Sequence, residues 1–377
     1  MTEQNKLQHR IALSLIKGIG PKLARNLIAY LGSESALFEE KLPTLAKVPG
    51  IGGALEQLLR SIDRDDILQK AEKECLFIEK HKITPVFFSD PAYPGRLSFC
   101  DDAPLMVYIH GQICYDAPKT ISIVGTRTPT DNGKELCEKL IADLAVRHPG
   151  TVIISGLAYG VDITAHSAAL KNGLPTIGVL AHGLDRIYPP GHRNTAREMI
   201  KEGALLTEFM SGTQPDKHNF VQRNRVIAGL TDATVVVQSA RKGGALITAE
   251  LARDYNRDVL AFPGRPGDEF SAGCNQIIKS HIAALIESVE DLEYALGWEI
   301  ENKQPQTVQG NLFATIETED QQTIMENLIE EKEMNLNILS LKCGLPVSKL
   351  SATLLDLEFK GLVKSKPGGI YRAVMTP

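Results

Sequence analysis

Short apolar runs rich in β-branched residues alternate along the chain with longer segments whose apolar residues recur at helical spacing. The apolar runs predict strands at 83–88, 105–111, 120–124, 151–155, 176–180, 205–208, 233–238 and 258–262. The intervening segments predict helices at 65–80, 134–147, 163–172, 194–202, 223–230 and 246–255. Strands that alternate with helices indicate an α/β fold with a parallel sheet, whose ligands bind at the carboxyl ends of the strands.

The stretch from Thr151 to Gly173 holds the most informative of these turns. Ser155-Gly156 and Gly160 leave the backbone free to approach a ligand, and Gly173 stands where a helix end favours a left-handed residue. We expect Asp162 to be the N-cap of a helix that begins at Ile163. A turn of this kind directs N–H groups outward, so a phosphate is the expected guest.

The N-terminal region carries two copies of a pattern in which a helix ends, a Gly-x-Gly turn follows and a new helix begins. The copies lie at 15–28 and 48–59. This pattern is similar to the helix-hairpin-helix (SAM-like) motif, in which the N–H groups of the turn hold a backbone phosphate. The residues expected to contact phosphate are Gly18, Gly20 and Lys22, with added charge from Lys17 and Arg25. The glycines can equally serve only to close a tight hairpin, and both readings stay open.

The C-terminal region begins with a polar linker, followed by helices at 321–331, 336–343 and 347–360 and a two-stranded ribbon at 362–372. This order resembles a winged helix. Its recognition helix carries Lys349 but also Asp356 and Glu358, so protein binding is as well supported as duplex reading. The predicted domains are a helical domain at 1–80, a sheet core at 81–298, a linker at 299–319 and a winged helix at 320–377.

Composition narrows the function classes. The formal net charge of −5 over 377 residues argues against a histone-like protein, although a local basic groove remains compatible with it. The six cysteines form no Cys-x-x-Cys pair, so the sequence suggests neither a zinc site nor a disulfide framework. It shows no signal-like N-terminal segment and no membrane-length apolar run, so we expect a soluble, cytoplasmic protein.

Basic residues gather in four segments that should converge at the strand ends. These segments are 125–127, 217–220, 223–225 and 241–244. Arginines supply charged forks for phosphate oxygens, Gly243-Gly244 can expose N–H groups, and Phe220 can stack on a base. Charge combined with one aromatic ring suits a single strand. The competing interpretation is that Arg223 and Arg225 are solvated residues of a surface helix.

Catalytic and metal-binding patterns are weaker. Asp162 and His166 are spaced i, i+4, but a capping Asp beside a helix-surface His is the commoner situation. The histidines 182, 192 and 218 lack the close spacing of a metal cluster. A Walker loop is absent, and no Gly-x-Gly-x-x-Gly follows a predicted strand. We therefore expect no enzymatic activity, no metal and no cofactor.

Several ordered motifs carry a resemblance to a known family. They are Ile-Val-Gly125-Thr-Arg127, Ser155-Gly-Leu-Ala-Tyr-Gly160-Val-Asp162, Gly183-Leu-Asp185 with Tyr188-Pro189, Arg223-Asn-Arg225, Gly244-Ala-Leu-Ile-Thr248 and Pro263-Gly264. In this order they resemble the DNA-processing protein A family (DprA, or Smf). The resemblance implies a Rossmann-like core that binds single-stranded DNA, forms a homodimer and helps load the recombinase RecA during natural transformation.

The resemblance also selects site residues. Those matching the family's DNA-contact motifs are Arg127, Lys217, Phe220, Arg223, Arg225 and Lys242. The full predicted DNA site adds Gly125, Thr126, Ser155, Gly156, Gly160, Asn224, Gly243 and Gly244. Two positions depart from the family pattern: Gln238 replaces the usual strand-end Glu, and Gly243-Gly244-Ala replaces the commoner Ser-Gly-Ser.

The end of the predicted core is a candidate dimer interface. The family pairs two subunits there, and a terminal sheet edge needs covering. Leu285 and Leu292 are the residues expected at the interface, and packing inside their own subunit is the alternative.

Two other function classes remain open. Residues 243–250, with Glu250, are similar to the Gly-Gly-x-Gly-Thr-x-x-Glu motif of nucleoside-monophosphate phosphoribohydrolases, but the third Gly is missing and Thr248 comes one place late. A scaffold that recruits partners through the C-terminal region is the other possibility.

Overall fold

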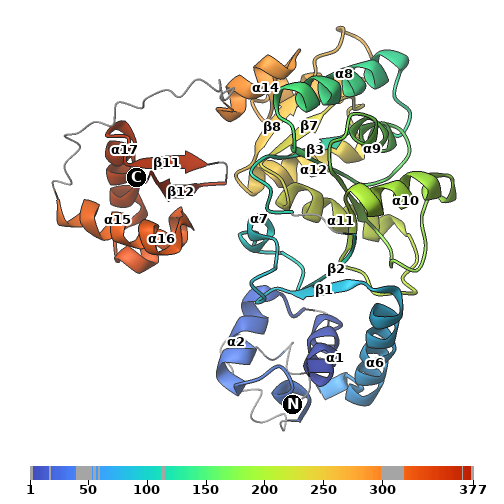
Figure 1. Ribbon diagram of the computed structural model, residues 1–377, viewed down its shortest axis with the longest axis vertical. Coiled ribbons are helices and arrows are strands. Elements are labelled where there is room, and N and C mark those ends of the chain that lie inside the picture. Colours follow the sequence, from blue (N-terminus) through green and yellow to red (C-terminus); the bar gives the residue numbers. More distant parts are fainter. Residues whose placement is uncertain are drawn as a thin grey trace.

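The computed structural model describes residues 3–16, 18–39, 53, 57, 60–111, 115–298, 318–366 and 368–374. Helices at the N-terminus pack against one edge of a large central sheet, and a smaller helical body with a β-hairpin forms the C-terminal part (Figure 1).

The central sheet has nine strands in the order β1-β2-β6-β5-β4-β3-β7-β8-β9. Their bounds are β1 Thr84–Phe87, β2 Met106–Gly111, β3 Thr120–Val124, β4 Val152–Ser155, β5 Thr176–Leu180, β6 Ala204–Thr207, β7 Ala233–Val236, β8 Asp258–Ala261 and β9 Ala284–Leu285. The strands from β6 to β9 are all parallel, which confirms the predicted parallel core. β2 pairs antiparallel with β6 and β1 pairs antiparallel with β2, so the sheet is mixed at this edge.

Helices cover both faces of the parallel strands. α8 (Asp131–Arg147), α9 (Val161–Lys171), α10 (Arg193–Glu202) and α14 (Val289–Leu296) pack on one face, and α11 (Lys217–Gly229), α12 (Gly244–Asp254) and α13 (Ala272–Lys279) pack on the other. Side chains of β4 alternate between the two layers: Ile153 packs with α8 and α9, whereas Val152 and Ile154 belong to the cluster that includes α11 and α12. Burial on both faces explains why these strands read as continuous apolar runs.

Two helix starts differ from prediction. α11 begins at Lys217, six residues before the predicted start, because Asp216 caps it by accepting a hydrogen bond from the Asn219 N–H at 2.9 Å. α9 begins at Val161 with Gly160 as its N-cap residue, so the expectation that Asp162 is the N-cap is wrong. The predicted left-handed residue at the end of this helix is confirmed, since Gly173 has a φ of +70°.

The N-terminal helices are α1 (Glu3–Ser14), α2 (Pro21–Leu31), α3 (Ala36–Glu39) and α6 (Arg64–His81). The first hairpin turn forms as predicted, with Gly18 at φ +86° and Gly20 as the N-cap of α2. The second copy, at 48–59, lies outside the described residues except for positions 53 and 57.

The N-terminal helices share a hydrophobic cluster with the sheet. Ile11 and Leu13 of α1 belong to the same cluster of buried side chains as Val86 and Phe87 of β1. Arg10 adds polar contacts, because Nε pairs with Glu34 at 2.9 Å, Nη1 pairs with Asp90 at 2.8 Å, and the guanidinium lies over the Phe87 ring. Helical region and sheet are therefore joined through one core.

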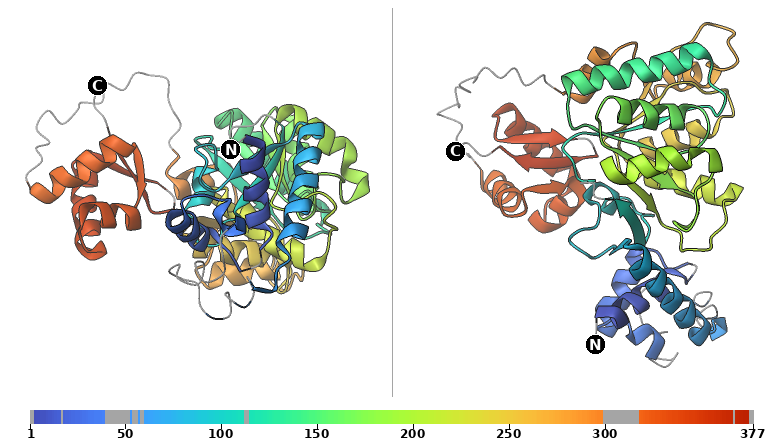
Figure 2. Two further views of the ribbon diagram at one scale, coloured as in Figure 1. Left: turned by 90° about the horizontal axis from the view of Figure 1, so that it is seen from below. Right: turned by 45° about the vertical axis from the view of Figure 1, so that its right-hand side comes forward.

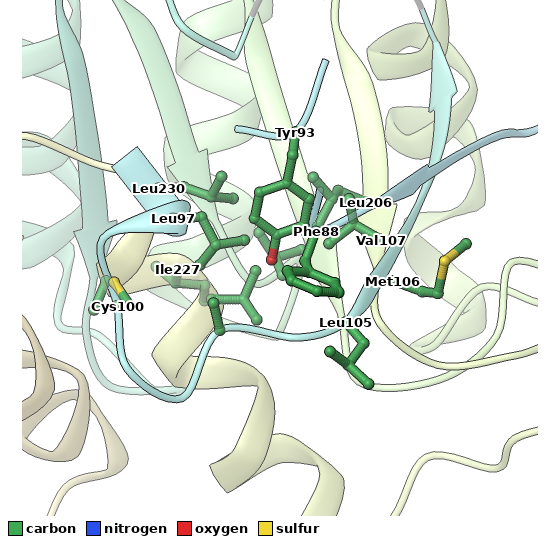
Figure 3. Packing of buried hydrophobic residues seen from close by; sticks show 14 of the residues in the cluster. Phe88, Tyr93, Leu97, Cys100, Leu105, Met106, Val107, Leu206, Ile227 and Leu230 are labelled. Atoms are coloured by element: carbon green, nitrogen blue, oxygen red, sulfur yellow. The ribbon is translucent and has the colours of Figure 1, made fainter. Parts of the chain in front are cut away.

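An irregular segment with one short helix, α7 (Gly95–Ser98), connects β1 to β2 and packs on α11. Figure 3 shows Leu97 and Cys100 of this segment beside Ile227 and Leu230, and Tyr93 near Leu206. The Tyr93 hydroxyl donates to the Pro104 carbonyl oxygen at 2.6 Å, which satisfies its one polar group in this apolar layer. This irregular segment thus covers part of α11.

The C-terminal body has the winged-helix arrangement that the sequence predicts (Figure 2). It contains α15 (Glu319–Glu331), β10 (Glu333–Asn335), α16 (Leu336–Cys343), α17 (Val347–Phe359), β11 (Val363–Lys366) and β12 (Ile370–Ala373), with strand order β10-β12-β11. Its buried residues form a separate cluster. In the part of the chain with described structure, no single helix is long and apolar enough to cross a membrane, and only α16 and α17, taken together across a 105° bend, reach that length.

Candidate nucleic-acid interface

The turns after β3 and β4 pack against each other through their backbones. A Cβ added to Gly160 would come within 2.6 Å of the Arg127 carbonyl carbon, and one added to Gly125 would come within 2.8 Å of Val161 Cβ. The Val161 N–H donates to the Thr126 carbonyl oxygen at 3.1 Å. Glycine is therefore required at both positions, and Gly125, Thr126, Arg127 and Gly160 are brought together as predicted.

Arg223 lies beneath the turn after β4. Its Nη1 donates to the Gly156 carbonyl oxygen at 2.7 Å and to the Val179 carbonyl oxygen of β5. Arg223 is only 4% exposed, so the competing interpretation of a solvated helix residue is wrong for this side chain, and its direct contact with DNA stays a prediction. A Cβ at Gly156 would come within 2.5 Å of the guanidinium carbon. Gly156 thus provides space for a buried cation.

Buried charge surrounds this arginine. Burial lowers the pKa of Arg223 to about 10, an effect that nearby Asp162 opposes and Arg127 reinforces. Burial raises the pKa of Asp162, while the charge of Arg223 and the Ala158 N–H, which donates to its carboxylate at 3.3 Å, act in the other direction. The two opposite charges therefore each favour the charged form of the other group.

Phe220 joins the two arginines. The guanidinium carbon of Arg127 lies 5.2 Å from the centroid of the Phe220 ring, and that of Arg223 lies 5.7 Å from it. Both distances fall within the range of cation–π interactions. Arg127 is exposed and Phe220 is half-buried, so this group faces solvent on the Arg127 side.

Ser155 and His166 are buried beside the same turn. The Ser155 hydroxyl donates to the Ile123 carbonyl oxygen at 2.6 Å, so it links two strands and is unavailable to a ligand at the surface. His166 is 0% exposed, and its Nδ1 lies 2.7 Å from the Thr176 hydroxyl oxygen. The expectation of a helix-surface histidine is wrong, because α9 turns His166 toward β4 and β5.

The loop after β7 lies at the same edge of the sheet as the turns after β3 and β4, and this edge is called the rim below. Gln238 is buried, and its Oε1 accepts a hydrogen bond from the Thr130 N–H at 2.9 Å, which ties the loop to the start of α8. Gly243 caps α12 and has no room for a side chain beside Ser239, whereas Lys242 and Gly244 are exposed. The amide side chain at 238 thus has a structural role.

The other predicted basic positions on α11 do not all face the site. Lys217 is exposed at the first turn, and Asn224 is half-buried. Arg225 instead pairs with Glu208 and donates to the Asp102 carbonyl oxygen, and its side chain is 14% exposed. Residues two apart on a helix point in different directions, so Arg223 and Arg225 do not converge. Arg225 is thus engaged away from Arg127 and Phe220, and its place in the DNA site stays a prediction.

Two exposed tyrosines lie near these residues and were not among the predicted site residues. Tyr159 is 52% exposed and lies in the turn after β4, and Tyr188 is 43% exposed and lies in the loop after β5. The Tyr188 ring centroid lies 6.0 Å from that of Phe220. Single tyrosines in loops carry no periodic signal, although both stand inside motifs that the sequence singles out.

The predicted dimer residues behave differently from each other. β9 is the last strand of the sheet, as expected, and Leu285 on it is 48% exposed. Leu292 is 0% exposed and belongs to the cluster between α14, α8 and the sheet. The prediction of Leu292 as an interface residue is wrong, because the side chain packs inside its own subunit.

Glu250, the acidic residue of the phosphoribohydrolase-like motif, lies on α12. It is an exposed residue, the seventh of α12, so it lies about 9 Å along the axis from the first residue of the helix. Thr248 is buried. Within the described residues, no group of three His, Cys, Asp or Glu side chains is arranged to hold a metal ion.

Comparison with known families matches the same three regions. Residues 84–297 match the family described as DNA recombination-mediator protein A. The chain belongs to this family. Residues 314–369 match the DprA winged helix domain, and residues 11–61 match the SAM-like helix-hairpin-helix tandem.

Relatives and solved structures extend the match. Protein Smf of Synechocystis is 31% identical, with 96% of this chain and 97% of that protein covered. The X-ray structure of DNA processing protein A from Streptococcus pneumoniae has a TM-score of 0.62 at 30% identity and covers 78% of this chain and 98% of that one. DNA processing protein A from Helicobacter pylori, whose structure addresses a single-stranded DNA binding mode, has a TM-score of 0.52 at 30% identity, covering 57% of this chain and 95% of that one.

Proposed function

We propose that this protein binds single-stranded DNA at the carboxyl ends of β3, β4 and β7. The observation that carries the proposal is the exposed Arg127 guanidinium, which lies over Phe220 beside the buried cation of Arg223. An arginine held on an aromatic ring is pre-oriented for bidentate contact with a phosphate. Exposed Lys217 and Lys242 supply further positive charge.

The turn glycines add backbone donors to this site. Gly156 and Gly160 belong to a strand–turn–helix unit that ends at the N-terminus of α9, where helix N–H groups and the macrodipole favour an anion. Their place beside Arg127 supports a path for several consecutive phosphates. The N-terminal turn at Gly18, Gly20 and Lys22 is exposed and offers a second phosphate contact in our proposal.

Family membership supports two further parts of the proposal. The bound strand is passed to the recombinase RecA, and two subunits pair through the sheet edge at β9. Exposed Leu285 on this edge strand fits a subunit contact, because an uncovered edge invites strand pairing. A two-fold dimer would place two sites on one strand and raise the apparent affinity.

We propose that the protein acts without catalysis. Asp162 and His166, the one acid–base pair suggested by spacing, lie beneath the surface, and the Asp162 carboxylate accepts a hydrogen bond from the Ala158 N–H. Incubation with nucleoside monophosphates and ATP, followed by chromatography, tests this directly. Release of a free base that a Glu250→Gln variant no longer produces would favour a phosphoribohydrolase instead.

The binding proposal is tested by titrating fluorescent single-stranded and duplex oligonucleotides across a salt series. We expect tighter binding of the single strand, with log affinity falling by about 0.7 per phosphate contact for each tenfold rise in salt. Arg127→Glu should weaken binding and flatten this slope. Arg253→Glu is the matched control, since Arg253 is exposed on the last turn of α12, far from the rim. Equal binding by both variants and the parent would overturn the proposal.

A further inference from the structure

The rim described above carries more exposed aromatic surface than Phe220 provides. Tyr188 and Tyr159 are 43% and 52% exposed, whereas Phe220 is half-buried. The Tyr188 ring is tilted 57° from that of Phe220 at a centroid distance of 6.0 Å. The centroids of the Tyr159 and His192 rings are 5.1 Å apart, and the ring planes meet at 74°. Two loops and helix α11 thus contribute aromatic rings to one side of the sheet.

The Phe220 ring is already engaged by cations. Both Arg127 and Arg223 place their guanidinium carbons within 6 Å of its centroid. Over the residues that the structure describes, no cation lies in this way over Tyr159 or Tyr188. Phe220 thus contacts both arginines, whereas the two more exposed tyrosine rings carry no such cation contact in the described part of the chain.

Neighbouring residues fix the backbone beside both tyrosines. His192, which packs against Tyr159, is buried, and its Nδ1 donates to the Leu157 carbonyl oxygen at 2.9 Å. Leu157 is itself fully buried with a φ of +56°, a conformation that persists only where the surroundings fix it. The Tyr188 N–H donates to His182 Nε2 at 3.3 Å. Pre-ordered rings lose little conformational entropy when a base stacks on them.

We propose that Tyr159 and Tyr188 form a base-stacking subsite for the nucleobases of a single strand, on either side of the Arg127 phosphate contact. The Tyr188 ring lies beside the Phe220 ring, which in turn contacts Arg127. Tyr159 precedes Gly160, whose Cα packs on the Arg127 backbone. The chemistry required of the ligand is an unpaired base with an accessible π face. This inference rests on the proposed single-strand binding.

The test compares an oligothymidylate with a strand of equal length in which the central nucleotides are abasic. Tyr159→Ala and Tyr188→Ala should each weaken binding of the oligothymidylate about tenfold, the effect of losing one base–aromatic stack. The same variants should bind the abasic strand as the parent protein does. Tyr159→Phe and Tyr188→Phe should keep the parent affinity, because the ring remains. Tyr30→Ala removes a tyrosine of similar exposure, 51%, from the end of α2 and should bind like the parent.

The outcomes distinguish a failure of the proposed tyrosine subsite from a failure of the proposed single-strand binding. Failure of the parent to bind either strand would remove the proposed function itself. Parent binding combined with alanine variants that bind the oligothymidylate normally would overturn the subsite alone. Equal losses on both strands, or loss in the phenylalanine variants, would show that the tyrosines contact the backbone through their hydroxyl groups. Thermal melts of each variant identify any loss that comes from unfolding.

Discussion

The guanidinium of Arg223 donates a hydrogen bond to the carbonyl oxygen of Gly156 at 2.7 Å, so a buried cation directly supports the turn after β4. The same Nη1 donates to the Val179 carbonyl oxygen, which ties this turn to the next strand of the sheet. Arg223 therefore shapes the proposed binding surface from below, while Arg127 is the cation that faces solvent.

Gly156→Ala tests this support. The added methyl group would overlap the guanidinium, and relieving the overlap requires a shift of Arg223 or of the turn. We expect a loss of about 1–3 kcal/mol in the free energy of unfolding, the usual cost of overpacking. Gly191→Ala is the control, because no atom lies within 4 Å of the added methyl group. Chemical denaturation measures both, and equal stability of the two variants would contradict the account of Gly156.

Arg225→Ala separates structural from DNA-contacting arginines. Arg225 and Glu208 form an ion pair with side-chain exposures of 14% and 8%, so removing the arginine leaves a buried carboxylate unpaired. We expect a loss of about 3 kcal/mol in stability. The salt slope of DNA binding by the folded variant should match that of the parent, in contrast to Arg127→Glu. A flattened slope for Arg225→Ala would support the predicted place of this residue in the DNA site.

His166 should make stability fall in acid. Burial lowers the pKa of His166 to about 3, whereas an unfolded histidine titrates near 6.5. Below about pH 6.5 the unfolded chain thus binds a proton that the native protein does not. The contribution of His166 is fully present above that pH and declines by about 1.4 kcal/mol per pH unit as the pH falls toward 3. His166→Gln should reduce the pH slope of unfolding free energy between pH 6 and 4, and an unchanged slope would contradict the neutral, buried imidazole.

The two leucines near the end of the core should respond oppositely to a charge. Leu285→Glu, on the exposed edge strand, should give a folded monomer with weaker DNA binding. Leu292→Glu places a carboxylate among buried apolar side chains and should unfold the core. Light scattering and thermal melts distinguish the two results. A Leu285→Glu variant that keeps the parent mass would move the interface elsewhere.

Removal of the C-terminal region tests whether the core folds and binds single-stranded DNA without the winged helix. The winged helix has its own buried cluster, and Lys349 on its recognition helix is already paired with Asp320 at 2.6 Å. We expect a chain ending near residue 306 to stay folded and to keep most of its affinity for single strands. A loss of most affinity on truncation would show that the winged helix contributes to the main site.

Local patterns in the sequence predicted most of the elements. Apolar runs located the parallel strands, and the glycines at 125, 156 and 160 located the turns, because these signals depend on neighbouring residues alone. The direction of β1 and β2 was not predictable from periodicity, since an antiparallel edge strand is as apolar as a parallel one. The three-residue strand β10 was missed because its pairing with β12 is long-range.

The site was less predictable than the fold. Arg223 is buried against the carbonyl oxygens of Gly156 and Val179. These acceptors lie 67 and 44 positions away in the sequence, so no local pattern reveals them. Arg225, two residues later, is held by Glu208 and by the segment around Asp102. Nothing local distinguishes these two arginines, and only the packing of α11 decides which of them approaches the turn after β4.

The hydrophobic cluster shared by α1 and β1 gives the two ends of the chain different evolutionary freedom. The winged helix closes its own core, so it can be exchanged for another module, or lost, without exposing apolar surface on the sheet. The N-terminal helices cover Val86 and Phe87, and their replacement requires matching substitutions in β1. We therefore expect that, among related chains, the C-terminal module varies in type, whereas the N-terminal helices and the first strand change together.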